Sequence, residues 1–227
     1  MAAPLLEMSQ VQSPALFSGA AHGAINLDLR RGDLALIDAR DAVLAGHFAD
    51  LCCGLMALEG GMVKFVGRDW TLLPHEHAEA MRGRIGRVFS GGSWLGFLDV
   101  ATNILLPQMH HTRRDVKALR DDAAALASIF GLPGLPLGPI SALSAADLIR
   151  AGLVRAFLGE PLLIVLESPV QGLHAELIPL LLNRITTMRD RGGAVIWLTR
   201  SRLVWGDRSF PATHRLRLNN RGLSPER

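Results

Sequence analysis

Short apolar runs that alternate with longer segments of helical periodicity constrain the fold of this chain most. Residues 34–37, 161–166 and 194–199 each form an apolar run that suits a buried strand. Apolar residues recur at helical spacing over 41–58, and a second helix is predicted at about 175–191. Strands that alternate with helices are typical of an α/β fold with a mostly parallel central sheet, which we therefore predict.

The rest of the chain divides into three parts. The first 23 residues show no sustained period and are predicted to be an N-terminal extension, followed by a single domain over 24–227. Within that domain, 97–157 is mostly helical and interrupted by a Gly- and Pro-rich loop at 131–140, which predicts an inserted helical subdomain. The other predicted elements are strands at 24–29, 62–66 and 85–89, a helix at 75–84 and a hairpin over 215–223.

Composition excludes several classes of protein. The 227 residues are 49% hydrophobic and 20% charged, which excludes a disordered, collagenous or coiled-coil chain. The apolar runs are far shorter than the roughly 20 residues of a membrane span. No basic stretch followed by an apolar core begins the chain, so a cytoplasmic location is expected. The 24 basic and 21 acidic side chains are scattered, and no nucleic-acid partner is expected.

Cysteine and histidine spacing gives no sign of a metal site. Cys52 and Cys53 are adjacent, which is poor geometry for a disulfide and does not match a C-x-x-C motif. We expect two buried thiols on a helix and no bound metal. The chain also lacks a G-x-S-x-G nucleophile elbow and a dinucleotide-binding fingerprint.

Four stretches of sequence, in their order and spacing, carry a family resemblance over roughly residues 24–223. They are GGMVKFVGRDW at 60–70, RIGRVFSGGSWLGFLDVATNILLP at 84–107, LSAADLIRAGLVRAFLGEPLLIVLESPVQGL at 143–173 and VIWLTRS at 195–201. The chain resembles the nucleotide-binding subunit of ABC transporters, and 84–107 is most similar to lipid-trafficking Mla-type ATPases. The resemblance implies a P-loop NTPase-like ABC ATPase fold with an N-terminal β part and an inserted helical subdomain.

The phosphate-binding loop implied by this resemblance corresponds to residues 39–47. Such a loop needs glycines that let backbone N–H groups approach the anion, a lysine for the β- and γ-phosphates and a hydroxyl for Mg²⁺. The glycine positions hold Ala39, Ala42 and Leu44, the lysine position holds Ala45, and the hydroxyl position holds Gly46. Because each required group is missing, no cofactor is expected, with ATP and Mg²⁺ bound weakly at most.

Charged residues around this loop also oppose a triphosphate. Asp38 and Asp41 lie where the anion would sit, and a like charge at 4 Å is unfavourable by about 1 kcal/mol in water and about 4 kcal/mol at an effective dielectric of 20. Arg40 and His47 could offset part of this repulsion. The simplest interpretation is a strand, a turn and a helix that bind no ligand.

The positions implied to carry catalysis are altered as well. Glu167 and Ser168 stand where an Mg²⁺-binding aspartate and a water-polarising glutamate are implied. Glu167 could still bind a metal through water, but the hydroxyl of Ser168 cannot accept a proton at neutral pH. Ser90 replaces the implied glutamine, His174 the implied aspartate and Arg200 the implied switch histidine. No catalytic residue is therefore expected.

The signature motif, which faces the nucleotide held by a partner subunit, needs a serine and two glycines at a helix N-terminus. Ser144 is retained and is predicted to cap the helix, whereas Ala145 and Ala146 replace the glycines. Asp147 suits the positive end of the helix dipole and opposes a phosphate.

Three hypotheses of function follow from these residues. The first is a non-hydrolysing ABC-type subunit that acts as a scaffold or regulator at a permease. The second is an ABC ATP-binding protein that still binds or hydrolyses ATP with atypical residues. The third is an unrelated α/β binding module or an enzyme of another kind. Nucleotide binding would favour the second over the first, and a neighbouring permease gene would separate the first from the third.

Partner contacts are expected only through the resemblance. It implies docking on an integral membrane permease, at the inner face of the cytoplasmic membrane, through 90–107 and the helical subdomain. Pairing with another ABC ATPase subunit or with itself is also implied. Trp94 and Leu95 are the predicted contact residues, because large aromatic side chains dominate interface energetics. For Phe97 and Leu98, core packing and partner contact remain equal alternatives.

Overall fold

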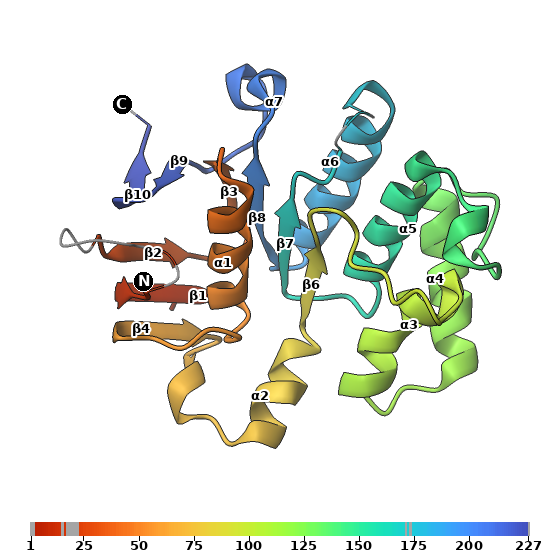
Figure 1. Cartoon of the computed structure of the whole chain (residues 1–227), viewed down its shortest axis with the longest axis horizontal. Helices are drawn as coiled ribbons and strands as arrows, with labels where there is room; N and C mark the ends of the chain where they lie inside the picture. The colour runs from red at the N-terminus through yellow and green to blue at the C-terminus, as the bar shows by residue number, and fades with distance from the viewer. Residues whose placement is uncertain (1–2, 15, 17–22, 171, 173, 227) are drawn as a thin grey trace.

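The larger of two sheets has the predicted, mostly parallel topology. A computed structural model describes residues 3–14, 16, 23–170, 172 and 174–226. The six-stranded sheet has the order β10-β9-β3-β8-β7-β6, and only the edge pair β9–β10 is antiparallel (Figure 1). The strands are β3 (Leu34–Asp38), β6 (Ile85–Val88), β7 (Leu163–Glu167), β8 (Ala194–Thr199), β9 (His214–Asn219) and β10 (Gly222–Pro225).

The smaller sheet is antiparallel and corrects the predicted N-terminal extension. Its order is β2-β1-β4-β5, so β1 (Leu6–Gln12) lies between β2 (Ile25–Leu29) and β4 (Gly60–Phe65). The boundary predicted at residues 23 and 24 is therefore wrong, because β1 is an inner strand of the domain. A bulge between Met8 and Val11, with Gln10 at φ +50°, interrupts the alternation that would have revealed the strand.

Helices cover both faces of the larger sheet. On one face, α1 (Ala42–Cys52) packs between the two sheets, and on the other α6 (His174–Asp190) packs beside the helical subdomain (Figure 1). Successive side chains of β3 point to opposite faces, so Leu36 joins the core on the helical-subdomain side and Ile37 joins the core under α1. The other helices are η1 (Trp70–Leu72), α2 (His75–Arg82), α3 (Val100–His111), α4 (Val116–Ile129), η2 (Ile140–Ala142), α5 (Ala145–Phe157) and α7 (Arg202–Gly206), and β5 spans Arg68–Asp69.

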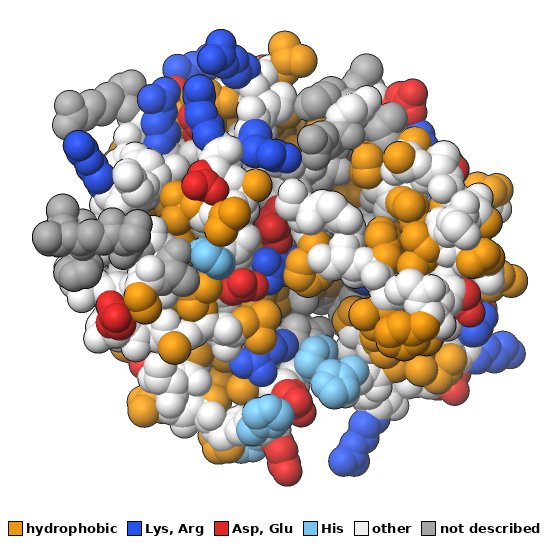
Figure 2. All heavy atoms as spheres, viewed as in Figure 1, with side chains coloured by type: hydrophobic (Ala, Val, Ile, Leu, Met, Phe, Trp, Pro, Cys, Tyr) orange, Lys and Arg blue, Asp and Glu red, His pale blue; other side chains and the backbone are white. Residues whose placement is uncertain are grey.

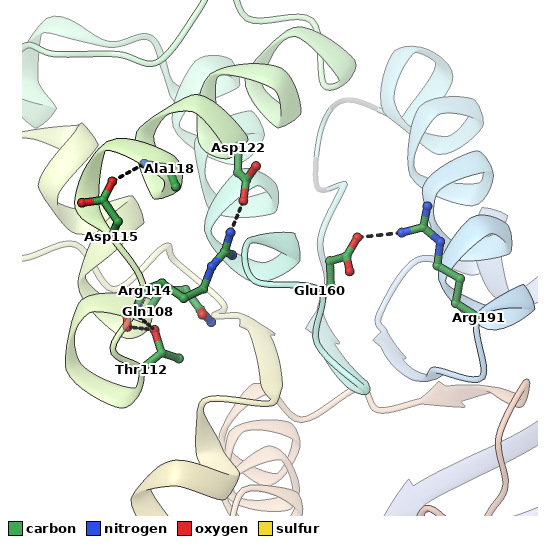
Figure 3. Close-up of polar contacts among 8 residues, drawn as sticks. All are labelled: Gln108, Thr112, Arg114, Asp115, Ala118, Asp122, Glu160 and Arg191. Carbon is green, nitrogen blue, oxygen red and sulfur yellow. Dashed lines mark hydrogen bonds and ion pairs between the residues drawn. The ribbon is translucent and has the colours of Figure 1, made fainter.

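Three helices, α3, α4 and α5, lie within residues 97–157, where the periodicity predicts helices, and we refer to them as the helical subdomain. The connection between α3 and α4 is held locally (Figure 3). Thr112 Oγ1 donates to the Gln108 carbonyl at 2.6 Å, and the Asp115 carboxylate accepts from Ala118 N at 3.0 Å as the N-cap of α4. Arg191 and Glu160 form an ion pair at 2.7 Å that links the end of α6 to the turn after α5.

The helix predicted over 41–58 is shorter than expected and ends at Cys52. Gly54 has φ +63°, which a residue without a side chain adopts most easily. The N–H groups of Gly54 and Leu55 bond back to the carbonyls of Leu51 and Asp50, which is the hydrogen-bond pattern of a Schellman cap. The apolar residues after Cys52 thus belong to the following loop. Among the described residues, none of the helices is long and apolar enough to cross a membrane.

Both cysteines are free and buried, as predicted. Burial raises the pKa of the Cys53 thiol to about 11 and raises the pKa of Cys52 well above its usual value. A thiol whose pKa is higher in the folded state stabilises the fold fully below the pKa of the unfolded chain, near 9, and loses that contribution as the pH rises.

We expect the free energy of unfolding to fall by about 1 kcal/mol for each cysteine between about pH 8.5 and pH 10. Urea titrations at the two pH values measure the change. Cys53→Ala should reduce the fall by about half. If the free energy of unfolding falls equally in the wild type and in a Cys52→Ala/Cys53→Ala variant, titratable groups other than the cysteines cause the fall.

Candidate functional site

Several residues singled out in the sequence lie at the carboxyl ends of the parallel strands. Asp38 ends β3, Glu167 ends β7 and Thr199 ends β8, with Asp38 paired to Thr199 and Glu167 to Leu198. Ligands in open α/β folds bind at this edge. Arg200 follows β8 and is exposed.

A cavity of about 310 Å³ lies beside this edge. Ser90, Glu167 and Ser168 line it together with Ala145 and Leu148 from the first turns of α5. The structure thus brings the altered catalytic positions and the start of the signature helix to one cavity. His174 begins α6, and its side chain lies outside the described part of the chain.

The N-terminus of α1 is capped by a side chain of the protein itself. The Asp41 carboxylate accepts from Val43 N at 2.8 Å and from Leu44 N at 3.1 Å. These N–H groups lie in the first turn of α1, within the segment where the family resemblance implies contacts to phosphate. A carboxylate that satisfies them repels a second anion. Asp41 therefore occupies the anion-binding end of this helix.

We expect Asp41→Ala to lower the free energy of unfolding by about 1 kcal/mol, because the two N–H groups lose their acceptor. Asp41→Asn is the matched control, since asparagine also caps helices and should cost only a few tenths of a kcal/mol. Urea unfolding followed by circular dichroism compares the two variants. Equal stability of Asp41→Ala and the wild type would show that the cap contributes nothing.

The remaining residues of this loop are used in packing or in local pairing. Ala39 and Ala45 are buried, so position 45 contributes a core methyl group in place of a cation. Gly46 is next to Glu167, whose Oε2 would lie 3.8 Å from a Cβ built on that glycine. Arg40 pairs with the nearly buried Asp38, with 3.4 Å between Nε and Oδ2. Arg40, which was expected to offset part of the repulsion of a triphosphate, thus pairs with Asp38 instead.

Glu167 is held by an arginine that sequence reasoning missed. Arg87 Nε lies 2.7 Å from Glu167 Oε1, and the same guanidinium pairs with Asp50 of α1 and donates to the Gly46 carbonyl at 3.3 Å. The side chains of Arg87 and Glu167 are 10% and 6% exposed. Glu167 therefore already has a buried positive partner at the place where a metal ion would bind. The available signal was an arginine inside the otherwise apolar strand 85–88.

The start of α5 confirms the predicted helix cap. Ser144 Oγ accepts from Asp147 N at 3.1 Å and donates to Asp147 Oδ2 at 2.8 Å. Arg150 bridges Asp147 to Glu176 of α6, with distances of 3.3 and 2.7 Å. The serine hydroxyl, the first-turn N–H and the aspartate thus satisfy one another within the chain.

The predicted partner-contact residues differ in exposure. Trp94 is half-buried, with the Arg155 guanidinium 4.5 Å from its ring centroid. Leu95 is 40% exposed, and its backbone N–H and carbonyl both bond to the Asn103 side chain. Phe97 is 83% exposed, so core packing, one of its two alternatives, is wrong. Leu98 is half-buried. Sequence reasoning preferred Trp94, whereas Phe97 is the more accessible aromatic side chain.

Comparison with solved structures decides the fold. The ATP-binding cassette MJ0796, in a dimer bound to ADP and Pi, matches with a TM-score of 0.82 and 17% identity over 98% of this chain and 97% of that chain. This chain has the ABC ATPase fold. The predicted P-loop NTPase-like architecture is confirmed.

Sequence comparison agrees with the ABC ATPase fold. The methionine import ATP-binding protein MetN of Rhizobium etli is 27% identical over 77% of this chain and 48% of its own length. The intermembrane phospholipid transport system ATP-binding protein MlaF of Haemophilus influenzae is 27% identical over 65% of this chain and 56% of its own. The chain spans about half the length of these curated relatives. No family model matches. The resemblance to ABC transporter ATP-binding subunits is confirmed.

Within the described part of this chain, no group of three or more His, Cys, Asp and Glu side chains could hold a metal ion. The residues at the implied nucleotide site do not fit Mg²⁺–ATP. Asp41 caps the helix that a phosphate would need, position 45 has no cation, and Arg87 pairs with Glu167.

Proposed function

We propose that this chain is a non-hydrolysing ATP-binding-cassette subunit of a membrane transport complex, where it acts as a scaffold or regulator. The observation that carries the proposal is the Asp41 carboxylate bound to Val43 N and Leu44 N, at the helix end where a phosphate would bind. An internal anion at this position stabilises the nucleotide-free form of α1. The fold of this chain is then stable without bound ATP.

The positions implied for catalysis support the same proposal. Hydrolysis needs a group that accepts a proton from the attacking water, and Ser168 cannot do so at neutral pH. Arg87 neutralises Glu167, which lowers the attraction of that carboxylate for a metal ion. No catalytic residue and no bound nucleotide are therefore part of the proposed role.

An exposed apolar patch on the helical subdomain supports docking on a membrane protein. The patch consists of Leu95, Phe97 and Leu137, which are 40%, 83% and 68% exposed. Their two loops are joined, since Val100 N donates to the Gly138 carbonyl at 3.1 Å and Asp99 pairs with Pro139. Hydrophobic side chains gather over this side of the molecule in Figure 2. Exposed apolar patches of this kind mark interaction sites.

Transport and the partners are inferred from relatives. MetN is described as an import protein and MlaF as part of a phospholipid transport system. We infer that this chain sits at the inner face of the cytoplasmic membrane through an integral permease. The dimeric cassette MJ0796 supports a second ABC-type subunit, either another ATPase or a second copy of this chain. Lipid transport, suggested by the likeness of 84–107 to Mla-type ATPases, is a hypothesis within this proposal.

The test is affinity capture of the tagged full-length chain from membranes of its native host. We expect an integral permease, identified by mass spectrometry, to co-purify with the wild type. Phe97→Asp should reduce its recovery at least tenfold, because a charge in the patch must be desolvated. Leu72→Asp is the matched control, since Leu72 is 80% exposed but lies in η1, and it should retain the permease. Recovery of no permease would contradict the proposal.

A further inference from the structure

We propose that a second cavity, between β6 and α3, binds an amphiphilic anion with an apolar tail and a carboxylate or sulfonate head. Its volume is about 430 Å³, within the range of small-molecule sites. It is lined by residues of β6, α3, the end of α2 and the loop after α1. Figure 2 shows a hollow between the two halves of the molecule, with histidine, basic and acidic side chains around it. This inference goes beyond the proposed function, and the cavity shares Leu106 and Pro107 with the segment 90–107 at which permease docking is expected.

Most of the wall is apolar. The contributing side chains come from the loop after α1, from β6 and the residue after it, from α3 and from the end of α5; they are Leu55, Ile85, Phe89, Leu106, Pro107 and Leu158. Leu55 is 58% exposed at this surface. A hydrocarbon tail would bury these side chains from water, and each methylene group contributes to binding.

The polar part of the lining is entirely cationic or neutral. Arg82, Arg87 and Arg155 contribute guanidinium groups, and no aspartate or glutamate lines the cavity among the described residues. The charge of Arg87 is offset by Asp50 and Glu167. Arg82 and Arg155 form no ion pair with a described residue, so two positive charges of the lining remain without a counter-ion.

Arg155 is the stronger of these two anion-binding candidates. It is 8% exposed, and burial lowers its pKa to about 10, so it is still charged at neutral pH. Its terminal nitrogens donate to the carbonyls of Gly92 and Ser93, while Nε has no partner among the described residues. Two carbonyl oxygens and the Phe89 and Trp94 rings compensate this guanidinium, but no described carboxylate pairs with it, so an anion near Nε would add a charge-assisted contact. Arg155 also lines the 310 Å³ cavity, together with Gly92 and Trp94.

The rim of the cavity adds donors that favour the same ligand. Arg82 Nε and Nη2 donate to the carbonyls of Cys53 and Gly54 at 3.1 and 2.7 Å, which holds the guanidinium at the edge. His110 and His111 at the end of α3 also line the cavity. Glu79 Oε1 lies 3.7 Å from His110 Nε2 and places a carboxylate beside this rim. A fully polar anion such as a nucleotide would leave the apolar wall unused, whereas an amphiphile uses both parts.

The test uses decanoate as the probe, titrated into the full chain in a calorimeter below its micelle concentration. We expect saturable binding of one decanoate with a Kd of about 0.1 mM. Decyltrimethylammonium, which has the same tail and the opposite charge, should bind at least tenfold more weakly. Butyrate, with the same head and a shorter tail, should also bind at least tenfold more weakly.

Matched variants at the cavity mouth separate charge from shape. Leu55→Glu should weaken decanoate binding at least tenfold, and Leu55→Gln, of similar size and without charge, should weaken it by less than about threefold. Both substitutions are at an exposed position outside the core, so the fold is kept. Arg84→Gln, an exposed arginine outside the lining, should leave binding unchanged.

Three results would overturn the proposal. They are the absence of saturable decanoate binding, equal affinity for decanoate and decyltrimethylammonium, and equal affinity of the Leu55→Glu and Leu55→Gln variants for decanoate. If decanoate fails to bind while Leu55→Glu abolishes capture of a permease, the cavity holds a protein segment instead of a small amphiphile. That outcome would leave the proposed function standing.

Discussion

Replacing Arg87 with methionine is expected to lower the free energy of unfolding by about 3–5 kcal/mol. The substitution leaves Glu167 buried, 5% exposed, without its positive partner, and it also removes the contacts to Asp50 and the Gly46 carbonyl. An uncompensated buried carboxylate costs far more than the ion pair gains. Because these contacts join β6, β7 and α1, the loss should lower the stability of the whole domain.

Chemical denaturation measures this loss, with Arg84→Met as the matched control. Arg84 precedes the same strand and is exposed, so its substitution should change stability by less than about 0.5 kcal/mol. The double variant Arg87→Met/Glu167→Leu should regain most of the lost stability, because no buried charge then remains without a partner. If Arg87→Met is as stable as Arg84→Met, the buried ion pairs do not hold these elements together.

The second large effect concerns ATP, whose dissociation constant should be no better than about 1 mM, with or without Mg²⁺. Asp41 already satisfies Val43 N and Leu44 N, and Asp38 adds a second negative charge at the end of β3. Steady phosphate release above a blank is not expected, because Ser168 cannot act as a base. Calorimetry and a phosphate-release assay on the purified chain measure the two quantities.

Variants separate the causes of weak ATP binding. Asp41→Ser keeps a helix cap and removes the negative charge, so ATP affinity should rise measurably while stability stays close to that of the wild type. A micromolar dissociation constant in the wild type would mean that Arg40, His47 or Arg200 forms an anion site. Steady ATP turnover that Glu167→Ala abolishes would show a working enzyme and contradict the proposed role.

Features set by neighbouring residues could be predicted from the sequence. The buried strands β3, β7 and β8, each apolar up to its last residue, and the helices of the subdomain follow from runs and periods within the elements themselves. The Ser144 cap follows from a serine directly before a helical pattern. The altered loop at 39–47 was likewise evident, because a missing lysine or glycine is a property of the sequence alone.

Contacts between distant segments were decided by the tertiary structure alone. The bulge at Gln10 hides the period of β1, so its place between β2 and β4 depends on strand pairing far along the chain. Arg87 pairs with Glu167 and Asp50, which are 80 and 37 residues away in the sequence. No local sequence pattern predicts such contacts. Phe97 is exposed in a loop whose Leu95 and Leu98 backbone groups bond to the Asn103 side chain. Local propensity determines the elements, whereas burial and charge pairing depend on which elements meet.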